Sequence, residues 1–288
     1  MRKRGDSMKT GIIGAGKVGC SLGRYFVLHG LSLSGFFDVD EESARAAAKF
    51  AEVSYETELE VLVKNSDALF LTVPDGLITD VWDQIKDMPI KGKFICHCSG
   101  ALSAEDAFPG IGSRGAFGYS VHPLFAVSDK FHSYEELTHA FFTIEGDEKH
   151  LKEISGLFES FGNQVRHIRA EDKVKYHCAA AICSNQVIGL IQESLDLLSE
   201  CGFDESSALA ALSPIITGNV AHIVNDGTVG SLTGPVERGD AGTVKKHLGC
   251  LNEKDQMLYK LISEKLVSIG KRKNPQRDYS PLTSLLQL

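Results

Sequence analysis

The sequence lacks several features that mark broad classes of protein. Its formal net charge of −8 leaves no basic excess for binding nucleic acid or an anionic membrane. The longest apolar run, around residues 178–191, is too short and too polar to span a bilayer, because Ser184, Asn185 and Gln186 interrupt it. No internal repeat or low-complexity tract is visible. These absences predict a globular protein with no nucleic-acid or membrane partner.

The seven cysteines include no CxxC pair, which argues against a zinc ribbon or a thioredoxin-like motif. We therefore expect no metal site, and reduced thiols as in cytosolic proteins. The first eight residues are basic, but a strand and a glycine turn follow them instead of the apolar segment of a signal peptide. The expected location is the cytoplasm.

Short apolar runs alternate with helical patterns in the first part of the chain. Strands are expected over residues 9–13, 31–37, 68–73, 93–98, 115–122, 140–144 and 164–168, with a short one near residue 53. Helices are expected over residues 17–29, 41–50, 77–85 and 148–161. This rhythm predicts an α/β domain with a doubly wound parallel sheet, covered by helices on both faces.

The pattern changes near residue 170. From residue 171 onwards we expect no strand, and helices over residues 173–201, 204–212, 214–224, 241–248 and 253–269. The first half of segment 173–201 is apolar nearly all round, so it should be buried. The sequence therefore predicts two domains, 1–170 for the α/β part and 171–288 for an all-helical part.

A glycine motif follows the first strand and opens the first helix. It reads Gly14-Ala15-Gly16-Lys17-Val18-Gly19. In this setting the first glycine makes a tight turn, the second lets the backbone approach a pyrophosphate, and the third lets helix and strand pack closely. The helix N-terminus adds unpaired N–H groups for the phosphates. The motif in this context predicts dinucleotide binding.

Asp38 ends the second strand, where a dinucleotide fold places the acid that binds the ribose hydroxyls. A carboxylate at this place repels a 2′-phosphate, and Val39 and Asp40 follow where an NADP enzyme would often have an arginine. The expected cofactor is NAD or NADP, with NAD favoured.

Three later strand ends have residues that suit a ligand site. Val73-Pro74-Asp75 is either a wall near the nicotinamide ribose or a plain proline turn. Ser99 either orients a substrate or forms a turn. His122, followed by proline, is either a general acid/base or a structural histidine bonded to a loop.

The helical half adds polar residues to an apolar segment. His177 and Ser184 share a helix face and Asn185 lies close to it, so they line a ligand site or form interhelical hydrogen bonds. The loop at residues 233–240 contains Glu237 and Arg238, and Arg238 pairs with Glu237 or reaches an anionic substrate. Asp240 is expected to cap the following helix.

The combined motifs resemble the superfamily of Rossmann dehydrogenases with an all-helical C-terminal domain. That superfamily includes prephenate dehydrogenase, pyrroline-5-carboxylate reductase, β-hydroxyacid dehydrogenase and ketopantoate reductase. The motifs are similar to those of a family that joins a Rossmann-like domain to a C-terminal domain of unknown function, with a helical part like that of 6-phosphogluconate dehydrogenase. They are the glycine loop, residues 97–102, 122–124, 175–180 with 184–185, and 233–240.

The resemblance implies roles for single residues. Prephenate dehydrogenases are similar in having a serine and a His-Pro pair that match Ser99 and His122, and there the histidine bonds the hydroxyl that loses its proton. Asn185 matches the asparagine of β-hydroxyacid dehydrogenases, but the lysine of that family has no counterpart, since the matching position is near Ala181. A homodimer formed through the helical domain is also implied.

Two hypotheses follow. In the first, the chain is an NAD(P)-dependent oxidoreductase acting on a small, anionic hydroxy acid, oxo acid or imine. The expected catalytic residues are His122, Ser99, His177 and Asn185, and Glu237 and Arg238 would bind substrate. In the second, it is a dinucleotide-binding sensor or scaffold without catalysis.

Overall fold

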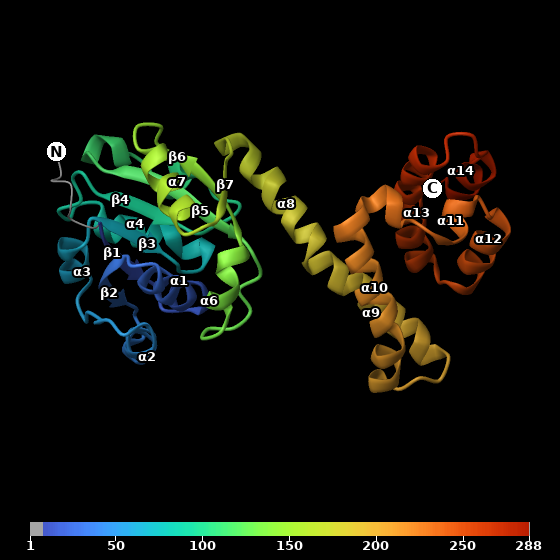
Figure 1. Cartoon of the computed structure of the whole chain (residues 1–288), viewed down its shortest axis with the longest axis horizontal. Coiled ribbons are helices and arrows are strands. Elements are labelled where there is room, and N and C mark those ends of the chain that lie inside the picture. Colours follow the sequence, from blue (N-terminus) through green and yellow to red (C-terminus); the bar gives the residue numbers. More distant parts are fainter. Residues whose placement is uncertain (1–7, 288) are drawn as a thin grey trace. The chain divides into compact units, whose positions relative to one another are not determined.

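A computed structural model of the chain describes residues 8–287 (Figure 1). The basic residues 1–7 lie outside the described part. Contacts divide the chain into two compact units, Met1–Gly189 and Leu190–Leu288. The first is an α/β unit and the second is helical, which confirms the expected fold class.

Seven strands form one sheet in the first unit, in the order β2-β1-β3-β4-β5-β6-β7. They are β1 Lys9–Ile13, β2 Ser32–Phe37, β3 Ala68–Leu71, β4 Phe94–His97, β5 Phe117–Leu124, β6 Phe141–Gly146 and β7 Gln164–His167. The order switches between β1 and β3, since β2 lies on one side of β1 and the later strands lie on the other. Open α/β sheets bind ligands in the crevice at such a switch point, outside the carboxyl ends of the strands.

Helices pack on both faces of this sheet. One face is covered by α1 Lys17–Leu28, α2 Glu41–Ala51 and α7 Leu151–Ser160, and the other by α3 Leu59–Asn65, α4 Ile78–Ile85 and α5 Ala104–Ala107. Successive strand residues point to opposite faces, so Ile12 enters the first core and Ile13 the second. The expected layered arrangement is confirmed.

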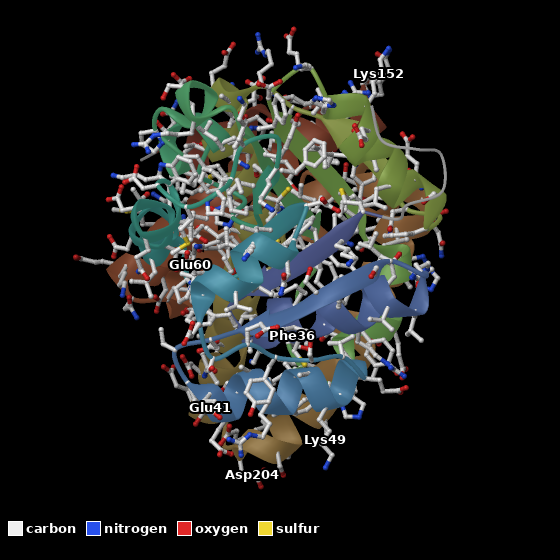
Figure 2. The ribbon with its side chains drawn as sticks, turned by 90° about the vertical axis from the view of Figure 1, so that its left-hand side faces the viewer. Phe36, Glu41, Lys49, Glu60, Lys152 and Asp204 are labelled. Atoms are coloured by element: carbon white, nitrogen blue, oxygen red, sulfur yellow. The ribbon has the colours of Figure 1, made fainter. Side chains whose placement is uncertain are left out.

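The edge strand β2 and its helix α2 are seen in Figure 2. Phe36 of β2 is fully buried. Glu41 and Lys49 lie toward the two ends of α2, where an acid in the first turn and a base in the last turn complement the helix dipole (Figure 2). The short strand expected near residue 53 is only a single bridge between Phe36 and Tyr55.

One pair of strands departs from the expected parallel arrangement, because β5 and β6 are antiparallel. Residues 125–140 connect them, and their only helix longer than a 3-10 turn is the short α6 (Ser133–Glu136). This connection packs beside α1 and α2: Ser21 Oγ lies 3.4 Å from the carbonyl oxygen of Asp129, and the ring of Phe131 meets Phe50 edge-on. The chain therefore stays at the carboxyl end of β5 and re-enters the sheet in the reverse direction.

The helix expected over residues 173–201 is two helices, α8 (Lys173–Cys183) and α9 (Asn185–Glu200). Ser184 separates them, with φ of −111° and ψ of −78°. The sequence places a domain boundary at residue 170, where the strands stop, whereas the contacts group α8 with the first unit.

The expected burial of α8 is wrong for the described chain. Val174 is 69% exposed and Ile182 is 58% exposed, and Lys173 is the one buried residue of this helix. An apolar composition indicates that a surface avoids water, but it does not say whether the same chain or another molecule covers it.

The second unit consists of helices packed on a small core. They are α10 Glu205–Ser231, α11 Gly234–Arg238, α12 Ala241–Cys250, α13 Glu253–Lys273 and α14 Ser280–Leu286, together with most of α9. The core includes Val244, Val267 and Leu282, so α14 packs against α12 and α13. Asp240 caps α12 by accepting a hydrogen bond from the Thr243 N–H, as expected.

The two helices expected over residues 204–212 and 214–224 form one, α10, with Pro214 inside it. Its departure from helical geometry comes later, at Gly227, whose φ is +71°. Among the described helices, the stretch Glu205–Arg238 is long and apolar enough to cross a membrane by length and composition alone, and an 18-residue window within it has a mean hydropathy of 1.4. Gly227 interrupts the helical geometry inside this stretch.

Candidate functional site

The glycine loop connects β1 to α1 at the switch point of the sheet. Gly14 has a φ of +101°, a conformation that side chains rarely adopt. A Cβ atom on Gly19 would overlap the carbonyl oxygen of Gly14, so the third glycine allows α1 to pack against the loop. A Cβ atom on Gly16 would meet no atom within 4 Å. The second glycine therefore keeps open a space that the protein itself does not fill.

Asp38 lies directly beside this loop. Its Oδ2 accepts a 2.6 Å hydrogen bond from the Ala15 N–H, and its Oδ1 accepts a 2.9 Å hydrogen bond from the Asp40 N–H. Next to it is a pocket of about 260 Å³ between the ends of β1, β2 and β3. The pocket is lined by Ile13, Gly14, Phe37, Asp38, Val39, Leu59, Val73, Leu77, Asp80, Val81 and Gln84. This slot is largely apolar with a carboxylate on its wall, which suits a flat ring linked to a sugar.

The other residues predicted to bind the cofactor lie at the ends of β1 and β3. Lys17 begins α1 and is exposed, and Val18 is half-buried against the core. Val73 lines the pocket, and Pro74 precedes the 3-10 turn that Asp75 begins.

Asp75 and Ser99 connect two neighbouring strand ends. The Ser99 hydroxyl donates a 2.6 Å hydrogen bond to Asp75 Oδ2 and accepts hydrogen bonds from the N–H groups of Ala101 and Leu102. Ser99 is buried, whereas Asp75 is exposed. The hydrogen bond between the Ser99 and Asp75 side chains therefore links the turn after β4 to the turn after β3.

His122 on β5 meets α8 at the same edge of the sheet. Its Nδ1 lies 2.8 Å from the hydroxyl oxygen of Tyr176. A Cβ atom on Gly100 would lie 2.8 Å from His122 Nε2 and 2.6 Å from His177 Cδ2, so the absence of a side chain there lets both rings approach the turn. The two imidazole centroids are 6.1 Å apart. Burial, with the charges of Lys173 and His177, lowers the pKa of His122 to about 4.

Lys173 is a site residue to which the sequence reasoning assigns no role. It is 1% exposed, and its ammonium group donates hydrogen bonds to the Ser99 carbonyl oxygen at 3.1 Å and to Ser120 Oγ. Burial lowers its pKa to about 8, although the nearby Glu145 and Asp75 favour the charged form. The spacing of Lys173, Tyr176 and His177 at i, i+3 and i+4 is the sequence signal that puts them on one face of α8.

A second pocket of the first unit opens beside His122 and has a volume of about 630 Å³. It is lined by His122, Leu124, Phe125, Ala126, Tyr176, His177, Ala179, Ala180, Ala181, Cys183, Ser184, Asn185 and Ile188. His122, His177, Ser184 and Asn185 thus line one cavity, although the helix that was expected to carry the last three is interrupted at Ser184. Ser184 also donates to the Ala180 carbonyl, at 2.8 Å. Ser99 lies behind Gly100 and does not line this cavity.

Glu237 and Arg238 lie in the second unit. Glu237 Oε1 accepts hydrogen bonds from Asn274 Nδ2 and Arg277 Nη1, and its carbonyl oxygen accepts one from the Tyr279 hydroxyl. Partial burial raises the pKa of Glu237, but the hydrogen bonds from Asn274 and Arg277 outweigh it and lower the pKa. Arg238 is exposed, and no described residue forms a hydrogen bond or ion pair with its guanidinium group. The geometry therefore favours a structural role for Glu237 and leaves Arg238 available.

Within residues 8–287, no group of three or more His, Cys, Asp or Glu side chains is arranged to hold a metal ion.

Comparison with curated protein sequences finds no match. Two family models match the chain: a Rossmann-like domain over residues 2–123, and a domain of unknown function, DUF2520, over residues 140–266. The two matched regions follow one another along the chain, with the Rossmann-like region first. The DUF2520 match begins at β6, so it includes the last two strands of the sheet as well as α8 and most of the helices that follow.

Solved structures with this arrangement include several reductases. The chain is similar to protein TM1727 from Thermotoga maritima, with 26% identity and a TM-score of 0.71 over 92% of this chain and 99% of that one. It is similar to 1-pyrroline-5-carboxylate reductase from Streptococcus pyogenes, with 14% identity and a TM-score of 0.63 over 91% and 99%. A reductive aminase from Aspergillus terreus, solved with NADPH, is 12% identical with a TM-score of 0.60 over 98% and 93%. At such low identities the last two comparisons show a shared fold alone.

Proposed function

We propose that this chain is a nicotinamide-dinucleotide-dependent oxidoreductase that transfers hydride to or from a small metabolite with a carbonyl, hydroxyl or imine group. The proposal rests on one observation. His122 and His177 approach each other over Gly100 at the carboxyl ends of the strands, the edge that also carries the glycine loop. Acid/base groups at that edge favour chemistry over binding alone. The reductases among the similar structures support the same reading.

The glycine loop and Asp38 would hold the cofactor. The open space at Gly16 suits a pyrophosphate at the N-terminus of α1, near the Lys17 ammonium group. Asp38 already accepts hydrogen bonds from two backbone N–H groups, but each of its oxygens retains a lone pair for a ribose hydroxyl. The pocket beside it suits the adenine ring. When bound, the nicotinamide would supply or accept the hydride.

We favour NAD over NADP for this site. The carboxylate of Asp38 would repel a 2′-phosphate, and Val39 and Asp40 add no positive charge beside it. The structure of the reductive aminase was solved with NADPH, so both cofactors belong in the test. Replacing Asp38 by asparagine should raise the affinity for NADPH relative to NADH.

His122 would act as the acid/base at the substrate. With its Nδ1 fixed by Tyr176, the Nε2 atom is the one directed at Gly100 and the free space beyond. His177 and Asn185, which line the cavity beside His122, would orient the substrate directly, and Ser99 would do so through the Gly100 turn that it holds. We further propose that Arg238, whose guanidinium group forms no hydrogen bond or ion pair with the described residues although its charge acts on Asp240, binds an anionic group of the substrate. We propose that Glu237 stabilises the fold of the second unit and does not bind the substrate.

We also propose that the protein is a cytoplasmic homodimer formed through its helical part. The exposed apolar side chains of α8 to α10, such as Ile188 and Val224, would be covered by a second copy. Light scattering of the purified chain tests this, and a monomer at micromolar concentration contradicts it.

The decisive experiment for the function is cofactor binding followed by a substrate screen. Isothermal titration with NAD(H) and NADP(H) should show binding, and the absence of any binding refutes the proposal. In the presence of the cofactor that binds, 2-oxo acids, hydroxy acids and cyclic imines are then tested for turnover. The variant His122→Ala should lower kcat/KM by about 10²–10⁴-fold. His139→Ala, a change at a histidine outside the site, is the matched control and should turn over normally.

A sensor or scaffold is the alternative function. It predicts cofactor binding that changes the assembly state, with no turnover of any compound in the screen. The arrangement of His122 with His177 argues against it, since a sensor needs no acid/base group there.

A further inference from the structure

Lys173 is a buried cation in the middle of the candidate site. It is the first residue of α8 and the only buried one in that helix. Removing an ammonium group from water costs free energy unless hydrogen bonds replace those to water. A buried lysine is therefore expected to have a structural or functional role.

The ammonium group of Lys173 joins three parts of the first unit. It donates to the carbonyl oxygen of Ser99 and to the hydroxyl of Ser120, and the Ser120 hydroxyl itself donates to the same carbonyl at 3.1 Å. The turn after β4, the strand β5 and the helix α8 are therefore linked at one point.

No carboxylate oxygen of the described residues lies within ion-pair distance of this ammonium group. The carboxylates of Glu145 and Asp75 act on its charge, but each forms a hydrogen bond elsewhere. Glu145 Oε2 accepts one from the Ala104 N–H, and Asp75 Oδ2 accepts one from the Ser99 hydroxyl. The positive charge is thus only partly compensated, and its field extends to neighbouring groups.

His122 is the neighbour most directly affected. Ser120 and His122 are two residues apart on β5, so their side chains lie on the same face of the strand. Tyr176 and His177 follow Lys173 by one helical turn, and Tyr176 meets His122 Nδ1. One face of α8 therefore holds the Ser99 turn through Lys173 and the imidazole through Tyr176.

We propose that Lys173 is a positioning residue, a buried cation that fixes the Ser99–Gly100 turn to β5 through Ser120 and places its charge on the strand face that carries the imidazole of His122. This inference rests on the proposed function only for the use of His122 as acid/base. The arrangement itself is a property of the folded first unit.

The groups that influence His122 are His177 and Tyr176 on α8, Lys173 on the same helix and His97 on β4. Burial is the largest cause of its low pKa of about 4, and the charge of Lys173 is the next. The pKa of Lys173 is itself lowered to about 8. Between these two values the site contains one charged lysine and a neutral imidazole, whose Nε2 accepts or donates a hydrogen bond according to its tautomer.

The test is an NMR titration of the His122 imidazole in the full-length protein without cofactor or substrate. In Lys173→Met the positive charge is removed and the apolar length is kept, so the His122 pKa should rise from about 4 toward the ordinary 6.5. Lys173→Arg retains the charge and should keep the pKa low. Ser120→Ala is the matched control, because it removes a hydrogen-bond acceptor but no charge, and the pKa should stay near its wild-type value.

A second measurement needs no variant. In the wild-type protein, the His122 resonances should show an additional inflection near pH 8, where Lys173 loses its proton. An unchanged His122 pKa in a folded Lys173→Met variant overturns the proposal. If that variant does not fold, the wild-type titration decides, and a flat response around pH 8 overturns it. Neither readout involves turnover, so a failure of the proposed oxidoreductase activity is seen separately.

Discussion

The hydroxyl of Ser99 donates a 2.6 Å hydrogen bond to Oδ2 of Asp75, joining the turns that follow β4 and β3. The Ser99 hydroxyl oxygen also accepts hydrogen bonds from the N–H groups of Ala101 and Leu102. A serine that the sequence presents as either a substrate-orienting group or a turn residue is thus built into a turn. Its orienting role at the substrate remains a prediction.

The Ser99–Asp75 pair should stabilise the first unit. Ser99→Ala leaves the Ala101 and Leu102 N–H groups without their acceptor, so we expect a loss of roughly 1–3 kcal/mol in the free energy of unfolding. A double-mutant cycle with Asp75→Ala should give a coupling energy of about 1 kcal/mol, because Asp75 is exposed and its charge is screened. Urea unfolding followed by the fluorescence of Trp82, the single tryptophan, measures both. Additive effects of the two changes would show that the hydrogen bond contributes nothing.

The second and third glycines of the loop should respond differently to substitution. Gly16 has open space around a Cβ atom and an ordinary φ of −73°, so Gly16→Val should cost no more than about 1 kcal/mol of stability but block the approach of a pyrophosphate. Gly19→Ala should instead destabilise the fold by roughly 1–3 kcal/mol, because the new Cβ overlaps the Gly14 carbonyl oxygen. Melting temperature and dinucleotide affinity are measured for each. Gly156→Ala, with open space on α7, is the control, and full cofactor affinity in Gly16→Val would contradict the loop's assigned role.

Glu237 and Arg238 are neighbours with different expected roles. Glu237→Ala removes the acceptor for Asn274 and Arg277, and should destabilise the second unit by roughly 1–2 kcal/mol and increase hydrogen exchange in α14. Arg238→Ala should change stability by less than about 0.5 kcal/mol, because the side chain is exposed. In the proposed enzyme it should raise KM for an anionic substrate. Equal destabilisation by both substitutions would show that Arg238 is also structural.

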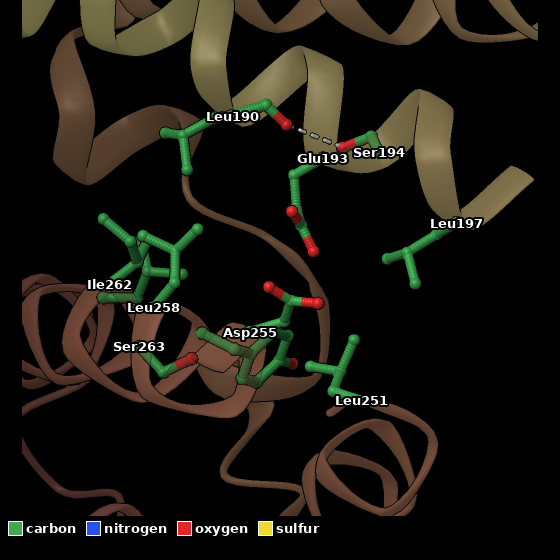
Figure 3. A pocket seen from close by; sticks show the side chains of 11 residues that line it. Leu190, Glu193, Ser194, Leu197, Leu251, Asp255, Leu258, Ile262 and Ser263 are labelled. Atoms are coloured by element: carbon green, nitrogen blue, oxygen red, sulfur yellow. Dashed lines mark hydrogen bonds between the residues drawn. The ribbon is translucent and has the colours of Figure 1, made fainter. Parts of the chain in front are cut away.

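A pair of carboxylates should make the second unit sensitive to pH. Glu193 of α9 and Asp255 of α13 face each other across a largely apolar pocket of about 310 Å³ (Figure 3). Burial, followed by the charges of Asp255 and Asp196, raises the pKa of Glu193. A raised folded-state pKa of an acid means that its stabilising effect is present at low pH and is lost as pH rises through that pKa.

The second unit should therefore become less stable as the pH rises above the ordinary glutamate pKa of 4.5. Glu193→Gln should abolish that decrease and stabilise the unit at neutral pH by roughly 0.5 kcal/mol, the scale of an exposed charge pair. Hydrogen exchange of the α13 amides measures the effect, and Glu200→Gln on the same helix is the control. An identical pH dependence in wild type and Glu193→Gln would refute the pairing.

The local elements of the first unit could be predicted from sequence because their signals are short-range. The tight glycine turn at Gly14, the acid at the end of β2 and the N-cap at Asp240 depend on residues within one or two turns of chain. Short apolar runs predicted the strands, and helical spacing of apolar residues predicted most of the helices that cover the sheet.

Contacts between distant segments could not be predicted in this way. The reversal of β6 depends on how residues 125–140 pack beside α1, and the role of Glu237 depends on Asn274 and Arg277, far along the chain. The apolar pattern of α8 predicted burial, but only packing decides which side chains are covered, and on that helix Lys173 alone is buried.

The sequence by itself determined the α/β organisation and the glycine loop with Asp38, because backbone conformation and strand alternation are set by neighbouring residues. Tertiary structure decided that the Ser99–Gly100 turn lies against His122 and His177, and that Lys173 donates a hydrogen bond to the Ser99 carbonyl oxygen. That assembly depends on three elements separated by many residues, β4, β5 and α8, and only their packing brings the hydrogen-bonding atoms within reach.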